Sequence, residues 1–143
     1  MKSFWLFLFF FCCLVPTSGI FADDRQDSAL GEAPAETAEN WLNLVDDHKY
    51  HQSWKKTSAF LQNQVPEDRW DQVMGTVRNS LGKVGDRKFS KIHHRDKLPG
   101  LPKGNYVVVQ YATNFDSKSE AVETVYLKKE GGDVWKVCGY YVK

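Results

Sequence analysis

The stretch that decides the fold is 106-YVVVQYATNF-115, whose β-branched and aromatic residues are typical of a strand. Two further segments of this kind follow at residues 121–129 and 134–142, with a Gly-Gly-Asp hairpin turn between them at 131–133. Residues 87–96 precede them and alternate only weakly, which predicts a strand at the edge of the sheet. We therefore expect four antiparallel strands in the C-terminal half.

Three helices are predicted ahead of the sheet. The first begins at Pro34, a second and shorter one covers about residues 50–61, and the third begins at Pro66 and ends at Gly82. Apolar residues recur at helical spacing in the first helix (Ala38, Trp41, Leu42 and Val45) and in the third (Trp70, Val73, Met74, Val77 and Leu81). Because the helices come first and the strands last, we expect an α+β domain with one sheet face covered by helices.

Length and composition agree with one ordinary globular domain. The chain has 143 residues, 26% of them charged and 42% hydrophobic, and a single core is commonly built from about 100–150 residues. Its formal net charge is only +1, which argues against nucleic acid as a partner, because such proteins need a basic surface to replace counterions.

The first 22 residues have the pattern of a secretory signal peptide. Lys2 supplies the positive charge, residues 4–15 are an unbroken apolar run, and Pro16 ends it. We expect cleavage between Ala22 and Asp23, with cleavage after Gly19 as the alternative. The apolar run is too short for a membrane span of about 20 residues, so the chain is predicted to be exported, periplasmic or secreted, with no stable span after cleavage.

After cleavage, residues 23–33 are predicted to be a flexible leader and residues 34–143 the single domain. Cleavage removes Lys2 and no acid, so the remainder is formally neutral. It also leaves Cys138 as the only cysteine, so no intramolecular disulfide can form. We place Cys138 on the outer face of the sheet beside Lys136, where it is either a packed apolar residue or, if exposed, a thiol that could link two chains.

Short segments in a fixed order resemble a known family. They are residues 38–42 (AENWL), 53–54 (SW), Trp70, 77–78 (VR), 81–82 (LG), Arg87, 98–100 (LPG), 106–111 (YVVVQY), 121–125 (AVETV) and 135–140 (WKVCGY). Together they resemble domain-of-unknown-function family 4019, whose members are mostly small exported bacterial proteins. The chain departs from the family pattern at Pro66, where a capping Ser is common, and in its charged run at 93–96. The resemblance implies a nuclear-transport-factor-2-like cone, in which a curved sheet wraps around the helices, and it implies no activity.

Glu123 is the most informative single residue. It shares one face of its strand with three apolar residues, and a carboxylate in such a place must be paired, hydrogen-bonded or protonated. One interpretation is a structural ion pair with Arg78 or Arg87. The alternative is that Glu123 acts as the general acid or base of a small cavity enzyme, of the isomerase or dehydratase kind found in the superfamily.

No metal or cofactor site is predicted. His93 and His94 are adjacent on a strand and point to opposite faces, so they cannot chelate one ion together. His48 and His51 straddle a helix break and lack further ligands of known spacing. The sequence contains no phosphate-binding glycine loop, nucleophile elbow, paired-carboxylate motif, zinc motif or haem attachment motif.

The aromatic residues suggest a binding role. Five of them are candidates to line an apolar ligand pocket, although such residues are usually core: Trp54, Trp70, Tyr111, Trp135 and Tyr141. We favour a non-catalytic module that binds a small apolar ligand or a protein. The alternatives are the cavity enzyme that uses Glu123 and a homodimeric envelope protein with a purely interactional role.

Overall fold

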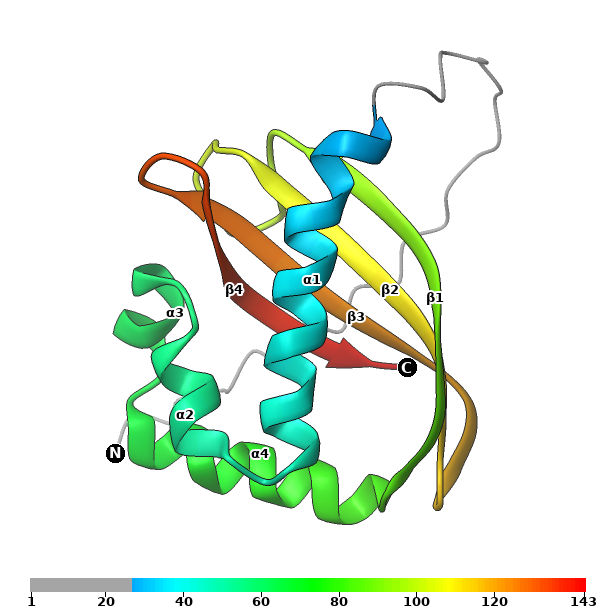
Figure 1. The fold of residues 1–143 in the computed structure, drawn as a ribbon. Coiled ribbons are helices and arrows are strands. Elements are labelled where there is room, and N and C mark those ends of the chain that lie inside the picture. The colour runs from blue at the N-terminus through cyan, green and yellow to red at the C-terminus, as the bar shows by residue number, and fades with distance from the viewer. Residues whose placement is uncertain (1–26) are drawn as a thin grey trace.

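Four antiparallel strands form one open sheet in the computed structural model, which describes the backbone of residues 27–143 and the side chains of residues 33–143. The strands are β1 (Val84–Arg95), β2 (Tyr106–Phe115), β3 (Lys118–Glu130) and β4 (Val134–Val142), in the spatial order β1-β2-β3-β4 (Figure 1). The α+β class, the antiparallel sheet and the edge position of β1 are thus confirmed. The predicted signal peptide and its cleavage site at Ala22 and Asp23 lie outside the described residues.

Four helices precede the sheet, where we expected three. They are α1 (Asp27–Asp46), α2 (Tyr50–Lys55), α3 (Ala59–Gln64) and α4 (Glu67–Leu81). The predicted helix over 50–61 is divided in two because residues 56–58 turn aside to meet the edge of β4. There Thr57 forms an isolated bridge with Val137, and the Ser58 amide donates to the Val137 carbonyl at 2.8 Å. The Ser58 hydroxyl then accepts from the Leu61 amide at 3.2 Å and so caps α3.

The predicted start of the first helix is wrong, whereas both ends of the last one are confirmed. α1 contains Pro34 and extends back to Asp27, into the segment predicted to be a flexible leader. A proline is expected in the first turn of a helix, because proline lacks the backbone N–H that a residue in the helix interior donates. Pro34 nevertheless lies inside α1. α4 begins directly after Pro66 and ends at Leu81, and Gly82 is its C-cap, with a φ of 78° that favours glycine.

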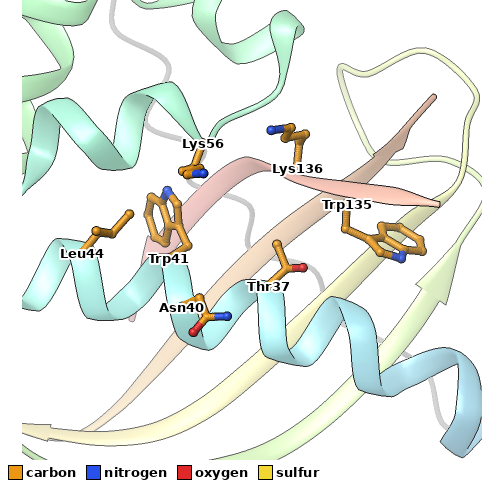
Figure 2. Close-up of a pocket in the computed structure, with 7 residues that line it drawn as sticks. All are labelled: Thr37, Asn40, Trp41, Leu44, Lys56, Trp135 and Lys136. Atoms are coloured by element: carbon orange, nitrogen blue, oxygen red, sulfur yellow. The ribbon is translucent and has the colours of Figure 1, made fainter. Parts of the chain in front are cut away.

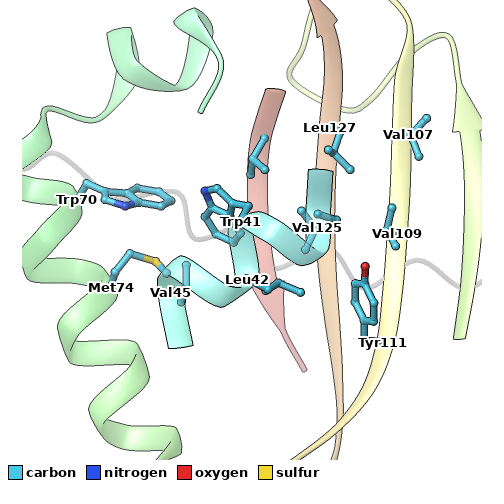
Figure 3. Packing of buried hydrophobic residues seen from close by; sticks show 12 residues of the cluster. Trp41, Leu42, Val45, Trp70, Met74, Val107, Val109, Tyr111, Val125 and Leu127 are labelled. Carbon is cyan, nitrogen blue, oxygen red and sulfur yellow. The ribbon is translucent and has the colours of Figure 1, made fainter. Parts of the chain in front are cut away.

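The main hydrophobic core lies between α1 and the sheet. Figure 1 shows α1 crossing one face of the sheet, with α4 below it leading into β1. The core residues come from α1, α4 and the inner faces of β2, β3 and β4 (Figure 3): Ala38, Trp41, Leu42, Val45, Trp70, Met74, Val107, Val109, Tyr111, Val125, Leu127 and Val137. Trp41 is central, since its ring contacts Trp70 at 6.2 Å and Tyr140 at 5.3 Å between centroids. The space between α1 and the strands is therefore filled with side chains.

A second, smaller cluster lies on the other face of the sheet. The β1–β2 connection places Leu98 against Tyr106 and Cys138, and the Tyr106 hydroxyl donates to the Pro102 carbonyl at 2.6 Å. Cys138 is thus on the outer face, as predicted, but it is buried beneath this loop.

A β-bulge in β4 changes which residues face the helices. Leu127 of β3 pairs with Val137, whereas the preceding residue, Tyr126, pairs with Gly139, so one extra residue lies in β4. Beyond this point the alternation is inverted, because the side-chain period of a strand is two. The prediction that Tyr141 faces the helices is therefore wrong, and Tyr140 takes that position instead.

Candidate functional site

A cluster of two carboxylates and two guanidinium groups lies beneath the helices and joins four elements of the fold. Glu123 comes from β3, Arg87 from β1, Arg78 from α4 and Asp46 from the last residue of α1. Arg87 donates from Nε to Glu123 Oε2 at 2.6 Å and from Nη1 to Asp46 Oδ2 at 2.6 Å. Arg78 Nη2 donates to Asp46 Oδ1 at 2.7 Å, and its Nη1 lies 3.5 Å from Glu123 Oε1. The structure thus brings Glu123 together with both arginines named from the sequence.

Two hydroxyl groups complete the surroundings of Glu123. Thr113 donates to Oε2 at 2.7 Å, and Tyr140 donates to Oε1 at 2.6 Å. Burial and the neighbouring charge of Glu123 raise the pKa of Tyr140 above its usual range, so this phenol remains a donor at neutral pH. Each oxygen of the Glu123 carboxylate therefore accepts at least two hydrogen bonds.

This arrangement is suited to holding the fold together. The side chain of Glu123 is 0% exposed and that of Arg78 is 3% exposed, and the Arg78 guanidinium also lies over the Phe115 ring at 5.0 Å. Burial by itself lowers the pKa of Arg87, but its hydrogen bonds to Asp46 and Glu123 raise that pKa overall. A general base must reach its substrate's proton, and the carboxylate of Glu123 is enclosed by four donor side chains.

Of the aromatic residues named as candidate ligand contacts, Trp70 belongs to the hydrophobic core and Trp54 packs against it. Trp70 is buried, and its indole N–H donates to the Ser53 hydroxyl at 3.0 Å. Trp54 packs against the same core and donates to the Val65 carbonyl at 2.8 Å. Both indole donors are satisfied within the protein, as expected of structural tryptophans.

The other three aromatic candidates lie apart from one another. Tyr141 lies on the outer face of the sheet, opposite Thr124. Tyr111 lines a shallow hollow between α1 and β1, beside the half-exposed ring of Phe89. Its buried hydroxyl has no hydrogen-bond partner among the described residues, and burial raises its pKa. Trp135 lines a different pocket, so these residues do not form one site.

That pocket, which we call the rim pocket, lies between α1, the end of α2 and the edge strand β4. It has a volume of about 200 Å³. Figure 2 shows its seven lining residues, namely Thr37, Asn40, Trp41, Leu44, Lys56, Trp135 and Lys136. It offers two indole rings, a leucine, two short polar side chains and two lysines. Ligand sites typically combine apolar and aromatic surfaces with polar groups that fix the ligand, and this pocket is a small one with both kinds of lining.

Two of the described histidines contact neighbouring side chains, and Cys138 is buried. His51 is paired with Glu67, and His48 contacts the Tyr50 hydroxyl at 2.6 Å. His93 is exposed on the edge strand β1. Within residues 27–143 no group of three or more potential metal ligands occurs, and no helix is long and apolar enough to span a membrane. Burial raises the pKa of Cys138 to about 12, so its thiolate is scarce at neutral pH.

The four charged residues Asp46, Arg78, Arg87 and Glu123 are called the ion cluster below. The sequence reasoning missed Asp46 of this cluster and the two hydroxyl groups that bond Glu123. Asp46 is the last residue of α1, and a carboxylate at that place carries no sequence signal beyond its charge. Thr113 shares the inner face of β2 with Val109 and Tyr111, and period-two alternation could have found it. Tyr140 could not be found that way, because the bulge in β4 inverts its orientation.

The family comparison agrees with the segments quoted from the sequence. The profile of a family described as "Protein of unknown function (DUF4019)" matches residues 37–140. The chain belongs to the DUF4019 family. No curated protein matches the sequence.

The match places both sites of this DUF4019 chain inside the family region. All four charged members of the ion cluster lie within residues 37–140, and so do all seven lining residues of the rim pocket. Family membership itself assigns no activity, so the function must be argued from these two sites.

Proposed function

We propose that this DUF4019 protein is an exported, non-catalytic binding module whose contact site is the rim pocket. The observation that carries the proposal is the contrast between its two polar sites. The ion cluster is closed, since every acidic group in it is already engaged by donors from the protein. The rim pocket is open to solvent and lined by side chains that can contact a ligand.

The filled interior supports binding at the surface over catalysis in a cavity. In a cone-shaped cavity enzyme, the acid or base lines a space large enough for the substrate. Here Trp41, Leu42 and Tyr140 occupy the region between α1 and the sheet. We therefore propose the nuclear-transport-factor-2-like cone as the architecture of the domain. In this chain core side chains fill the space that holds a ligand in a cavity enzyme.

The position of the rim pocket also supports a contact role. Edge strands present unpaired backbone groups and are common contact sites. Residues 57 and 58 cover the β4 edge at Val137, and the neighbouring Trp135 lies next to this covered point. Trp135 packs against the core and also lines the pocket, which is the behaviour of an anchor side chain at a binding site.

The export part of the proposal rests on residues 1–22 alone. N-terminal sequencing of the protein purified from an envelope or culture fraction would test it. We expect the sequence to begin at Asp23. A chain that retains Met1 and fractionates with the cytoplasm would contradict export without affecting the proposed binding role.

Fluorine NMR would test the binding role directly. The protein is labelled with 5-fluorotryptophan, each resonance is assigned by substitution, and mixtures of small soluble aromatic and apolar compounds are added. Binding at the rim pocket predicts that the Trp135 resonance shifts first, with Trp41 next and Trp70 unchanged. If no compound moves Trp135, or if Trp70 and Trp54 move instead, the rim pocket is not the contact site.

A further inference from the structure

We propose that the rim pocket selects an anionic ligand, namely an oxyanion such as a carboxylate, sulfonate or phosphate carried on a small aromatic or apolar body. This inference rests on the proposed function, because it specifies the class of ligand that the same pocket takes. Two features carry it: the charges that line the pocket and the apolar surface of its floor.

The charges that line the pocket have one sign. Lys56 and Lys136 both line it, and no acidic residue does so. In Figure 2 Lys56 lies just above the Trp41 ring, and the amine of Lys136 is directed to the side on which Lys56 lies. Neither lysine forms an ion pair with any described residue. Two like charges facing one opening raise the local concentration of anions there.

The sheet contributes one lysine to the pocket. Lys136 belongs to the edge strand β4 and lines the pocket from there. It lies directly opposite Lys128 of β3, but Lys128 is also opposite Tyr106 and therefore faces the outer side of the sheet, away from α1. Like charges in directly opposed positions destabilise a sheet, so this pairing is unfavourable for folding alone.

The neighbouring Lys129 differs from Lys56 and Lys136. Its amine bonds Asp133 at 2.6 Å and lies 5.9 Å from the centre of the Trp135 ring. Its charge is thus already compensated, and its contact with the ring helps to hold Trp135 at the mouth of the pocket. Among the described lining residues, the charges available to a ligand are those of Lys56 and Lys136.

The floor of the pocket determines the rest of the ligand. Trp41 and Trp135 offer ring surfaces and Leu44 an aliphatic one, so an inorganic ion alone would leave this apolar surface in contact with water. Asn40 and Thr37 add polar groups on the α1 side. A volume of about 200 Å³ holds one or two rings or a short chain, and because the pocket is open to solvent, a further ring can extend beyond its mouth. We therefore specify a small body.

A matched pair of fluorescent probes tests the class of ligand. 8-Anilinonaphthalene-1-sulfonate and N-phenyl-1-naphthylamine share the same ring body, and only the first carries a sulfonate. We expect the sulfonate to bind wild-type protein more tightly than the neutral probe. Raising NaCl from 50 to 500 mM, a range over which the Debye length falls to a few ångströms, should weaken the sulfonate and not the neutral probe.

Substitutions then assign the preference to the two lysines. The double variant Lys56→Gln/Lys136→Gln should bind the sulfonate about threefold to tenfold more weakly, as expected for one exposed and one half-buried charge, with the neutral probe unchanged. The control Lys91→Gln/Lys118→Gln removes the same charge from exposed positions in β1 and at the start of β3. It should leave both probes unchanged.

The outcomes separate this inference from the proposed function. Equal binding of both probes, weakened in Trp135→Ala, would overturn the anionic class and keep the rim pocket. Sulfonate binding that is the same in the Lys56/Lys136 variant and the control would also overturn it. Failure of both probes to bind, with no fluorine shift at Trp135, would overturn the inference and the proposed function together.

Discussion

Replacing Glu123 by Gln removes the negative charge at the centre of the ion cluster and keeps the size of the side chain. In the wild type, the charges of Arg78 and Arg87 are balanced by Asp46 and Glu123. The variant leaves two guanidinium groups with one carboxylate. The cost of the lost charge falls mainly on Arg78, because its side chain is only 3% exposed and water cannot solvate its guanidinium group.

The expected loss of stability is large. Removing one partner from a buried ion pair costs about 3–5 kcal/mol, against a total stability of about 5–15 kcal/mol for a domain. A loss of about 4 kcal/mol, at a urea slope of about 2 kcal/mol per M, lowers the unfolding midpoint by about 2 M. Urea titration followed by tryptophan fluorescence measures it, because Trp41 and Trp70 are buried in the folded protein.

Two further variants complete this experiment: one is a control for the chemical change, and the other tests whether charge balance is the cause of the lost stability. Glu120→Gln makes the same chemical change at an exposed position on the same strand and should leave the midpoint unchanged. Glu123→Gln/Arg78→Met restores charge balance and should lose less stability than the two single variants added together. A midpoint for Glu123→Gln equal to that of Glu120→Gln would refute the structural role of the cluster.

Three other predictions follow from single contacts. Cys138 should react with Ellman's reagent at pH 8 at least about 100-fold more slowly in the folded protein than in urea, because burial raises its pKa to about 12; equal rates would contradict its burial. Tyr140→Phe should cost about 1.5–3 kcal/mol at pH 7, since the phenol bonds a charged group. Because the folded pKa of Tyr140 is raised, the stability it supplies is complete below the unfolded pKa of about 10 and is lost as the pH rises from there toward the folded pKa, so the urea midpoints of variant and wild type should begin to converge above pH 10 and should still differ at about pH 10.5. Gly82→Ala should cost more than about 1 kcal/mol in thermal unfolding, since φ is +78° and the new Cβ would lie 2.8 Å from Asp116 Cβ; an unchanged Tm would contradict this.

The sheet was predictable because its signal is local. The β-branched and aromatic residues of 106–115 identified β2, and the glycines at 131 and 132 adopt the positive φ values that a tight hairpin turn requires. The split between α2 and α3 was not predictable from periodicity. It depends on the contact of residues 57 and 58 with Val137, which is about 80 residues away in the sequence.

The ion cluster was predictable in part for a clear physical reason. A carboxylate on an apolar strand face requires a counter-charge, so Glu123 indicated an arginine partner, and both candidates, Arg78 and Arg87, are in contact with it. Nothing local indicated Asp46, because its partners lie on other elements. Tyr140 was assigned to the wrong face because a single extra residue in β4 inverts the alternation.

The rim pocket could not be predicted at all. Its lining comes from α1, α2 and β4, and it exists only once the α2–α3 connection has met the edge of β4. Of the five aromatic residues proposed as ligand contacts, only Trp135 lines it. Aromatic content indicates how much apolar surface a chain has, but it does not distinguish core from pocket.

The most direct test of the account measures probe binding and stability together in Glu123→Gln. The variant is studied at low temperature without urea, where circular dichroism confirms that it remains folded, and titrated with 8-anilinonaphthalene-1-sulfonate. We predict wild-type affinity together with a urea midpoint lowered by about 2 M, because Glu123 supports the fold and the rim pocket binds the ligand. Lost affinity with an unchanged midpoint would contradict this account and would place the ligand site at Glu123.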